Sequence, residues 1–248
     1  MCLILLAHRV HPTYPLILLA NRDEDHARPT ATAHFWSDGN EVLGGRDLVA
    51  NGTWLGINKT GRWSAISNLR YLIPHRPDSK SRGHLVREFL TSQTSVDTFI
   101  TEQQKNGHQY NGYNLLLGQL TLPQSEVVYL TNAQSQAIVF SPGIYGVSNH
   151  ILGTNWSKVV EGKRRLTAII DQEQIKAEFL LDIMKQPGDN TESAIFVANS
   201  HYGTRSTTLI LVDQHGNVLL IERTYHSTDG ADPEKDSDIT FQFRINLR

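Results

Sequence analysis

The sequence predicts an α+β protein built as a four-layer αββα sandwich of antiparallel sheets. Apolar segments of strand length are mostly joined by short turns, which is typical of antiparallel hairpins. Helical segments are grouped between blocks of strands and do not alternate with single strands, and the apolar strands need cover on both faces. With 248 residues, the chain is long enough to form one domain, 1–248, with a substantial core.

Each strand is predicted from a short apolar run bounded by turn residues. In chain order the predicted strands span residues 2–10, 14–20, 41–43, 53–58, 62–68, 113–118, 126–131, 137–140, 144–147, 207–212, 218–223 and 239–246. A turn at Pro12 and Thr13 makes a hairpin of the first pair. A second hairpin turns through Lys59, Thr60 and Gly61, where the glycine supplies the positive φ that a three-residue connection needs.

Helices are predicted where apolar residues recur at spacings of three and four. The four helical segments include residues 85–90, 96–100, 156–170 and 175–184. The last of them ends before Pro187 and Gly188, which stop a helix. Residues 229–238 are acidic and predict a solvated loop.

Composition excludes several classes of protein. The net charge of -2 argues against a nucleic-acid partner, which requires a basic face. No apolar run approaches the ~18 residues of a membrane span, and the N-terminus lacks the features of a signal peptide, so we expect a cytoplasmic protein. A single cysteine excludes an internal disulfide, and the eleven histidines are scattered, so no metal site is expected. The sequence does not indicate an oligomeric state.

Cys2 is the first candidate for chemistry, and two interpretations stay open. In an apolar strand a lone cysteine commonly serves as a small buried hydrophobe. Removal of Met1, however, would place a thiol and an α-amine on the same residue. The amine has a pKa of about 8 and the thiol a pKa of about 8.5, so the amine can act as the base for its own thiol. Retention of Met1 would block that mechanism.

Charged residues follow the second predicted strand. This segment contains Arg22, Asp23 and Glu24, and it is either a solvated turn or a group that orients an amine, lowers the pKa of a thiol or binds a substrate carboxylate. Arg205 stands just before a later strand, where it could bind an anion or lie on the surface.

Two asparagines stand where predicted strands end. Asn68 closes the second hairpin, and Asn149 follows the strand that ends at 147. A side-chain amide in such a position can donate to a developing oxyanion, although a turn asparagine is an equally good explanation.

Motifs along nearly the whole chain match one family. They are Met1-Cys2, Asn21-Arg22-Asp23-Glu24, Arg28-Pro29, Gly44-Gly45-Arg46-Asp47, Gly52-Thr53-Trp54-Leu55-Gly56, Ser81-Arg82-Gly83, Tyr113-Asn114-Leu115, Gly146-Val147-Ser148-Asn149, Trp156-Ser157-Lys158 and Tyr202-Gly203-Thr204-Arg205-Ser206-Thr207-Thr208. In these segments the chain resembles the NRDE family, also called the transport and Golgi organisation protein 2 family. The resemblance implies an N-terminal nucleophile hydrolase-like fold, with a more distant similarity to choloylglycine hydrolase and penicillin V acylase.

The more distant similarity also implies roles for individual residues. Cys2 matches the nucleophile that follows the initiator methionine, and residues 22–25 match an Arg-x-x-Asp segment, with Asp23 or Glu24 as alternative acids. Asn68 matches an oxyanion-hole asparagine. Asn149 matches part of a Thr-Asn-Asn segment in which His150 replaces the second asparagine, and Arg205 falls near a late arginine.

Three functional hypotheses follow. The first is a hydrolase that cleaves an amide or thioester through Cys2 and requires no cofactor. The second is a carrier or chaperone that holds haem, an acyl lipid or acyl-CoA in the same pocket, in keeping with the roles in haem trafficking, lipid homeostasis, secretion and Golgi organisation that the resemblance implies. The third is an interaction protein with a vestigial site.

Overall fold

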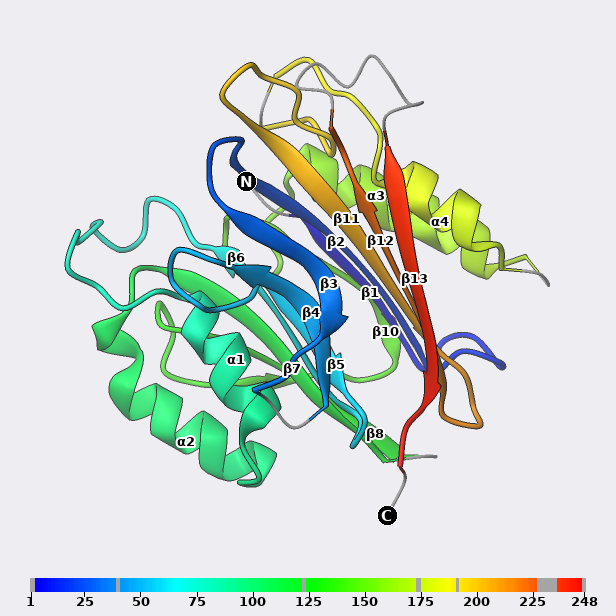
Figure 1. Ribbon diagram of the computed structural model, residues 1–248, viewed down its shortest axis with the longest axis horizontal. Coiled ribbons are helices and arrows are strands. Elements are labelled where there is room, and N and C mark those ends of the chain that lie inside the picture. Colours follow the sequence, from blue (N-terminus) through cyan, green and yellow to red (C-terminus); the bar gives the residue numbers. More distant parts are fainter. Residues whose placement is uncertain are drawn as a thin grey trace. The chain divides into compact units, whose positions relative to one another are not determined.

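The computed structural model describes residues 3–38, 41–121, 124–172, 175–190, 192–226 and 236–246 (Figure 1). Its strands are β1 (Ile4–His8), β2 (Leu16–Asp25), β3 (Thr30–Phe35), β4 (Val42–Asp47), β5 (Leu55–Asn58), β6 (Arg62–Asn68), β7 (Tyr113–Thr121), β8 (Gln124–Thr131), β9 (Ile138–Val139), β10 (Gly143–Val147), β11 (Tyr202–Val212), β12 (Asn217–Thr224) and β13 (Ser237–Arg244). Its helices are α1 (Gly83–Thr91), α2 (Val96–Asn106), the single 3₁₀ turn η1 (Gly107–Gln109), α3 (Ser157–Ile170) and α4 (Ala177–Ile183).

The described residues form two compact units that interleave along the chain. The first unit draws on 1–28, 142–148 and 152–243, and the second on 29–141, 149–151 and 244–248. Each unit contains one antiparallel sheet, so the predicted α+β class with two antiparallel sheets is confirmed. No helix within the described part of the chain is long and apolar enough to cross a membrane.

The first unit is a six-stranded sheet in the order β10-β1-β2-β11-β12-β13. Helices α3 and α4 cover one face of this sheet (Figure 1). Alternate residues of a strand share a face, and most of those facing the helices are apolar. The resulting core includes Leu5, Ala7, Ile17, Leu19, Leu209 and Leu211 from the strands and Val159, Leu166, Leu180 and Met184 from the helical segments.

The second unit is a seven-stranded meander in chain order from β3 to β9, with α1 and α2 packed on it. Phe89 of α1 and Phe99 of α2 meet edge to face with ring centroids 5.0 Å apart. The start of α1 approaches the chain before β5 so closely that a Cβ added at Gly52 would lie 2.6 Å from the carbonyl carbon of Gly83. This close approach fixes where α1 begins.

Most predicted elements are confirmed, although many of their boundaries differ, and the differences in β2, β3 and β4 are the most informative. The first two strands form the expected hairpin, and Gly61 has the expected positive φ of 84°. However, β2 continues to Asp25, five residues beyond the predicted end, because β11 pairs with it throughout. Strand β3 was not predicted, and the short strand placed at 41–43 is the longer β4. Most of the predicted acidic loop lies outside the described residues.

Candidate active site

The charged segment that was expected to follow the second strand is part of β2 itself. Successive side chains of a strand point to opposite faces. Asn21 and Asp23 therefore share the helix-covered face with Leu19, whereas Arg22 and Glu24 point to the other face. The side chains of Arg22 and Asp23 therefore point to opposite faces of the sheet.

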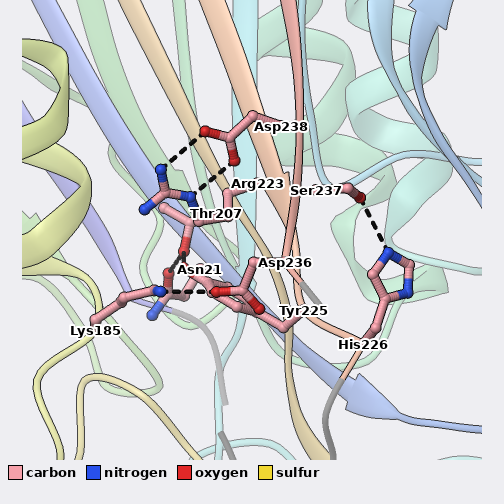
Figure 2. A network of polar contacts seen from close by, with 9 residues as sticks. All are labelled: Asn21, Lys185, Thr207, Arg223, Tyr225, His226, Asp236, Ser237 and Asp238. Carbon is pink, nitrogen blue, oxygen red and sulfur yellow. Dashed lines mark hydrogen bonds and ion pairs between the residues drawn. The ribbon is translucent and has the colours of Figure 1, made fainter. Parts of the chain in front are cut away.

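Asn21 is a structural residue. Its Nδ2 donates to the carbonyl oxygens of Met184 and Ile195, at 2.9 and 2.8 Å, and its Oδ1 accepts from Thr207 Oγ1 at 2.6 Å. The hydroxyl of Tyr225 lies 2.8 Å from Thr207 Oγ1 (Figure 2). Asn21 is only 1% exposed, and its amide supplies the donor that these two carbonyl groups need.

Further polar contacts join this region to the last strand (Figure 2). Lys185 forms an ion pair of 2.7 Å with Asp236, and Arg223 contacts both carboxylate oxygens of Asp238 at 2.8 Å. These contacts hold the start of β13 beside the end of β12. Tyr225 directly follows β12.

Asp23 is a buried carboxylate with defined partners. Thr204 Oγ1 donates to its Oδ1 at 2.7 Å, while the same hydroxyl accepts from the backbone N–H of Val197 at 2.9 Å. Burial raises the pKa of Asp23, against the opposing effects of the Thr204 hydrogen bond and the positive charge of Lys158. A raised pKa gives this carboxyl group the proton affinity that acid–base chemistry uses.

Arg22 and Glu24 occupy different environments on the opposite face of β2. Arg22 is buried and pairs in register with Ser206 of β11. Glu24 is half-exposed, and its carboxylate accepts from the backbone N–H of Asp25 at 2.9 Å and lies 3.9 Å from Nε of Arg28. Glu24 therefore stabilises the turn after β2, and Asp23 is the buried acid of the segment.

Arg205 was expected just before a strand, and the structure places it inside β11. It lies where the register with β2 shifts by one residue, between Thr204 and Ser206. Its Nη1 donates to the carbonyl oxygens of Asp25 and Arg28 at 2.9 and 3.1 Å. The bulge thus directs this guanidinium to the turn that follows β2.

Cys2 lies outside the described residues. Leu3 follows it in the chain, and the carbonyl oxygen of Leu3 accepts from the backbone N–H of Asn21 at 2.9 Å. Leu3 is therefore hydrogen-bonded to Asn21, the first residue of the Asn-Arg-Asp-Glu segment.

Asn68 ends β6, as predicted, and its side chain is exposed. Within the described residues its side-chain amide makes no hydrogen bond, so it can donate to a ligand. Its carbonyl oxygen accepts from Nδ2 of Asn149 at 2.7 Å, and the carbonyl of Asn149 accepts from the N–H of Arg70 at 2.9 Å. Asn149, which is fully buried just after β10, therefore positions the backbone on both sides of Leu69.

Asn114 supports this arrangement and was not identified as a site residue. Its Nδ2 contacts Ser67 Oγ at 3.3 Å and the carbonyl oxygen of His150 at 3.0 Å, and its Oδ1 accepts from Tyr129 Oη at 2.7 Å. A polar amide near the start of a strand that continues with three leucines is the signal that could have found it.

A pocket of about 490 Å³ opens beside Asn68. Its lining residues all come from the second unit and are Asn68, Leu69, Arg70, Tyr71, Ile73, Pro74, His75, Arg82, Asn111 and Gly112. The pocket therefore combines apolar walls with amide, imidazole and guanidinium groups.

Comparison with known proteins identifies the family. The model of the transport and Golgi organisation 2 family matches residues 1–227. The chain belongs to this family. The transport and Golgi organization 2 homolog of Mus musculus is 34% identical to this TANGO2-family chain over 99% of both chains.

Two solved structures are similar to this TANGO2-family chain in fold. A variant of conjugated bile acid hydrolase from Clostridium perfringens matches with a TM-score of 0.57 and 12% identity, covering 100% of this chain and 98% of that one. A Caenorhabditis elegans ortholog of N-acylethanolamine-hydrolyzing acid amidase matches with a TM-score of 0.51 and 13% identity, covering 85% and 92%. These matches confirm the predicted N-terminal nucleophile hydrolase-like fold.

Proposed function

We propose that this TANGO2-family protein is a cysteine N-terminal nucleophile hydrolase that cleaves an amide or thioester bond. The observation that supports it best is the hydrogen bond between Leu3 and Asn21, because it ties the residue after Cys2 to the Asn-Arg-Asp-Glu segment. The hydrolase-like fold and the unpartnered amide of Asn68 in a pocket also support it.

In the proposed mechanism Met1 is removed and the thiolate of Cys2 attacks the substrate carbonyl carbon. The α-amine of Cys2 takes the thiol proton and delivers it to the leaving nitrogen or sulfur. Asp23 orients the protonated amine, and the positive charge of Arg22 lowers the pKa of the thiol. Water then attacks the acyl-enzyme, passes a proton through the same amine, and releases the acid and the regenerated thiol.

The remaining site residues stabilise the oxyanion, position another site residue or stabilise a nearby turn. Asn68 donates its amide to the oxyanion, a contribution worth about 2.7–4 kcal/mol where single donors of this kind have been removed. Asn149 positions Asn68 by donating from its Nδ2 to the backbone carbonyl oxygen of Asn68. Glu24 and Arg205 stabilise the turn from Asp25 to Arg28, so we place them outside the reacting atoms.

Intact mass and hydrolysis together test this proposal. Mass spectrometry of the purified protein is expected to show loss of Met1, and a panel of N-acyl amides and acyl thioesters is expected to contain a substrate. Cys2→Ala abolishes turnover, and Asn68→Ala lowers kcat about 100-fold or more. Asn106→Ala, which alters an exposed asparagine on α2, serves as the matched control. A processed protein that is inert towards the whole panel would refute the proposal.

A second candidate is a cytoplasmic carrier of haem, an acyl lipid or acyl-CoA. Such a carrier agrees with the roles in haem trafficking and secretion that the family resemblance implies. The pocket favours it through the apolar side chains of Leu69, Ile73 and Pro74 beside His75. Titration with haem is expected to shift the Soret band at stoichiometric protein, and His75→Ala to abolish that shift. An unchanged spectrum would eliminate haem as the cargo.

A further inference from the structure

The pocket beside Asn68 has a cationic lining. Arg70 and Arg82 both line it, and none of the described residues in its wall is acidic. The guanidinium of Arg70 makes no hydrogen bond or ion pair with any other described residue, although it is half-buried. A half-buried guanidinium without a carboxylate partner is a strong candidate for binding an anion, because it can bind carboxylate or phosphate through two parallel hydrogen bonds.

The second arginine is fixed by the backbone around it. Nη1 of Arg82 donates to the carbonyl oxygen of Gly112 at 3.1 Å. Arg82 also precedes Gly83, the first residue of α1, and the first turn of that helix carries no acidic residue. The partial positive charge of the helix start therefore adds to that of Arg82.

The loop that carries Arg70 has a defined conformation. Asn111 bonds both backbone groups of Arg76, with its Oδ1 accepting at 2.8 Å and its Nδ2 donating at 2.9 Å. Tyr71 has a φ of +67°, which is unfavourable for a bulky residue, and its ring lies 5.9 Å from that of His150. Strain of this kind persists where the surrounding structure determines it, and it is common at ligand-binding loops.

We propose that this pocket is an anion subsite that binds a carboxylate or phosphate group of the substrate. Arg70 makes the main contact and Arg82 the second, while Asn68 of the same pocket is two residues from Arg70. A catalytic role for this subsite rests on the proposed function. In that case the substrates are acyl amides or thioesters that bear a negative charge close to the scissile bond.

Binding to the full-length Cys2→Ala protein tests the subsite separately from turnover. Calorimetric titration uses N-acetylglycine as the carboxylate probe, N-acetylglycinamide as its neutral counterpart and N-acetyl-O-phosphoethanolamine as the phosphate probe. At least one anionic probe is expected to bind about tenfold or more tightly than the neutral probe. The tighter of the two anionic probes identifies the preferred group.

Charge-removing variants locate the binding. Arg70→Gln is expected to abolish the preference for the anionic probe, and Arg164→Gln, at an exposed arginine of α3, to leave it unchanged. Equal affinities for charged and neutral probes, absence of binding to all three, or an undiminished preference in a folded Arg70→Gln variant would each overturn the subsite. Anion binding without hydrolysis of any amide or thioester would refute the hydrolase while leaving the subsite intact. Hydrolysis without a preference for anionic substrates would refute the subsite while leaving the hydrolase intact.

Discussion

At the scale of single residues, the structure divides the Asn-Arg-Asp-Glu segment into separate tasks. Asn21 bonds backbone groups, Asp23 is a buried carboxylate, and Glu24 contacts the turn after its strand. The sequence could identify the segment as unusual because charged residues follow an apolar run. It could not assign these tasks, because the partners of Asn21 and Asp23 come from far along the chain.

Asp23→Asn is expected to maintain or increase the free energy of unfolding at neutral pH while abolishing the proposed activity. Because the folded-state pKa is raised above its ordinary value of 3.8, the native state binds more protons than the unfolded chain above that pH. Stability is therefore greatest below that pH and falls as pH rises through the folded-state pKa. Asp23→Asn has no carboxyl group to titrate at this position, so its unfolding free energy does not fall for this reason.

Urea unfolding at a series of pH values measures the effect of Asp23→Asn. The stability of the variant relative to the wild type is expected to grow with pH, and Asp182→Asn, at an exposed aspartate of α4, to show no such trend. A variant that becomes less stable relative to the wild type as pH rises would show that Lys158 more than offsets the burial of the charge.

At the scale of elements, the hairpins were predictable because local turn chemistry specifies them. Gly61 has the positive φ that its turn requires, and Asn68 ends β6 as expected. Strand β3 escaped prediction because only Ala33 in it is buried, so it lacks an apolar signal. The extension of β2 depends on pairing with β11, a contact that no local pattern reveals.

The same long-range dependence limits prediction of the candidate site. Position alone identified Asn68 and Asn149 as residues at strand ends. Their mutual hydrogen bond, and the support that Asn114 gives to Ser67 and His150, are tertiary contacts. Sequence could therefore nominate the donors but not distinguish the residue that binds a ligand from the residue that positions it.

Asn21→Ala is expected to release the segment after α4 from the sheet. The change leaves the carbonyl groups of Met184 and Ile195 buried without their donor, at a cost of about 2–4 kcal/mol in unfolding free energy. Hydrogen exchange is expected to increase first between residues 184 and 197. Asn199→Ala, at an exposed position, controls for loss of an amide, and equal stability of the two variants would contradict the structural role.

At the scale of the whole molecule, His8 makes the stability of the fold sensitive to acid. It lies in β1, between two neighbouring strands of the six-stranded sheet, and is 1% exposed. Its Nδ1 is buried without a hydrogen-bond partner among the described residues. Burial, assisted by the charge of Arg9, lowers the pKa of His8 from 6.5 to about 4.

The unfolding free energy is therefore expected to fall as pH decreases from 6.5 towards about 4. In that range the unfolded chain binds a proton at position 8 that the native state excludes, so stability is fully present above 6.5 and is lost on acidification. His8→Leu, which fills the buried position without a titratable group, flattens this part of the profile. His34→Leu, at a partly exposed histidine of β3, does not. If both variants keep the wild-type slope in urea unfolding between pH 4 and 7, other groups govern the acid sensitivity, because a neutral buried His8 must contribute one proton to that slope.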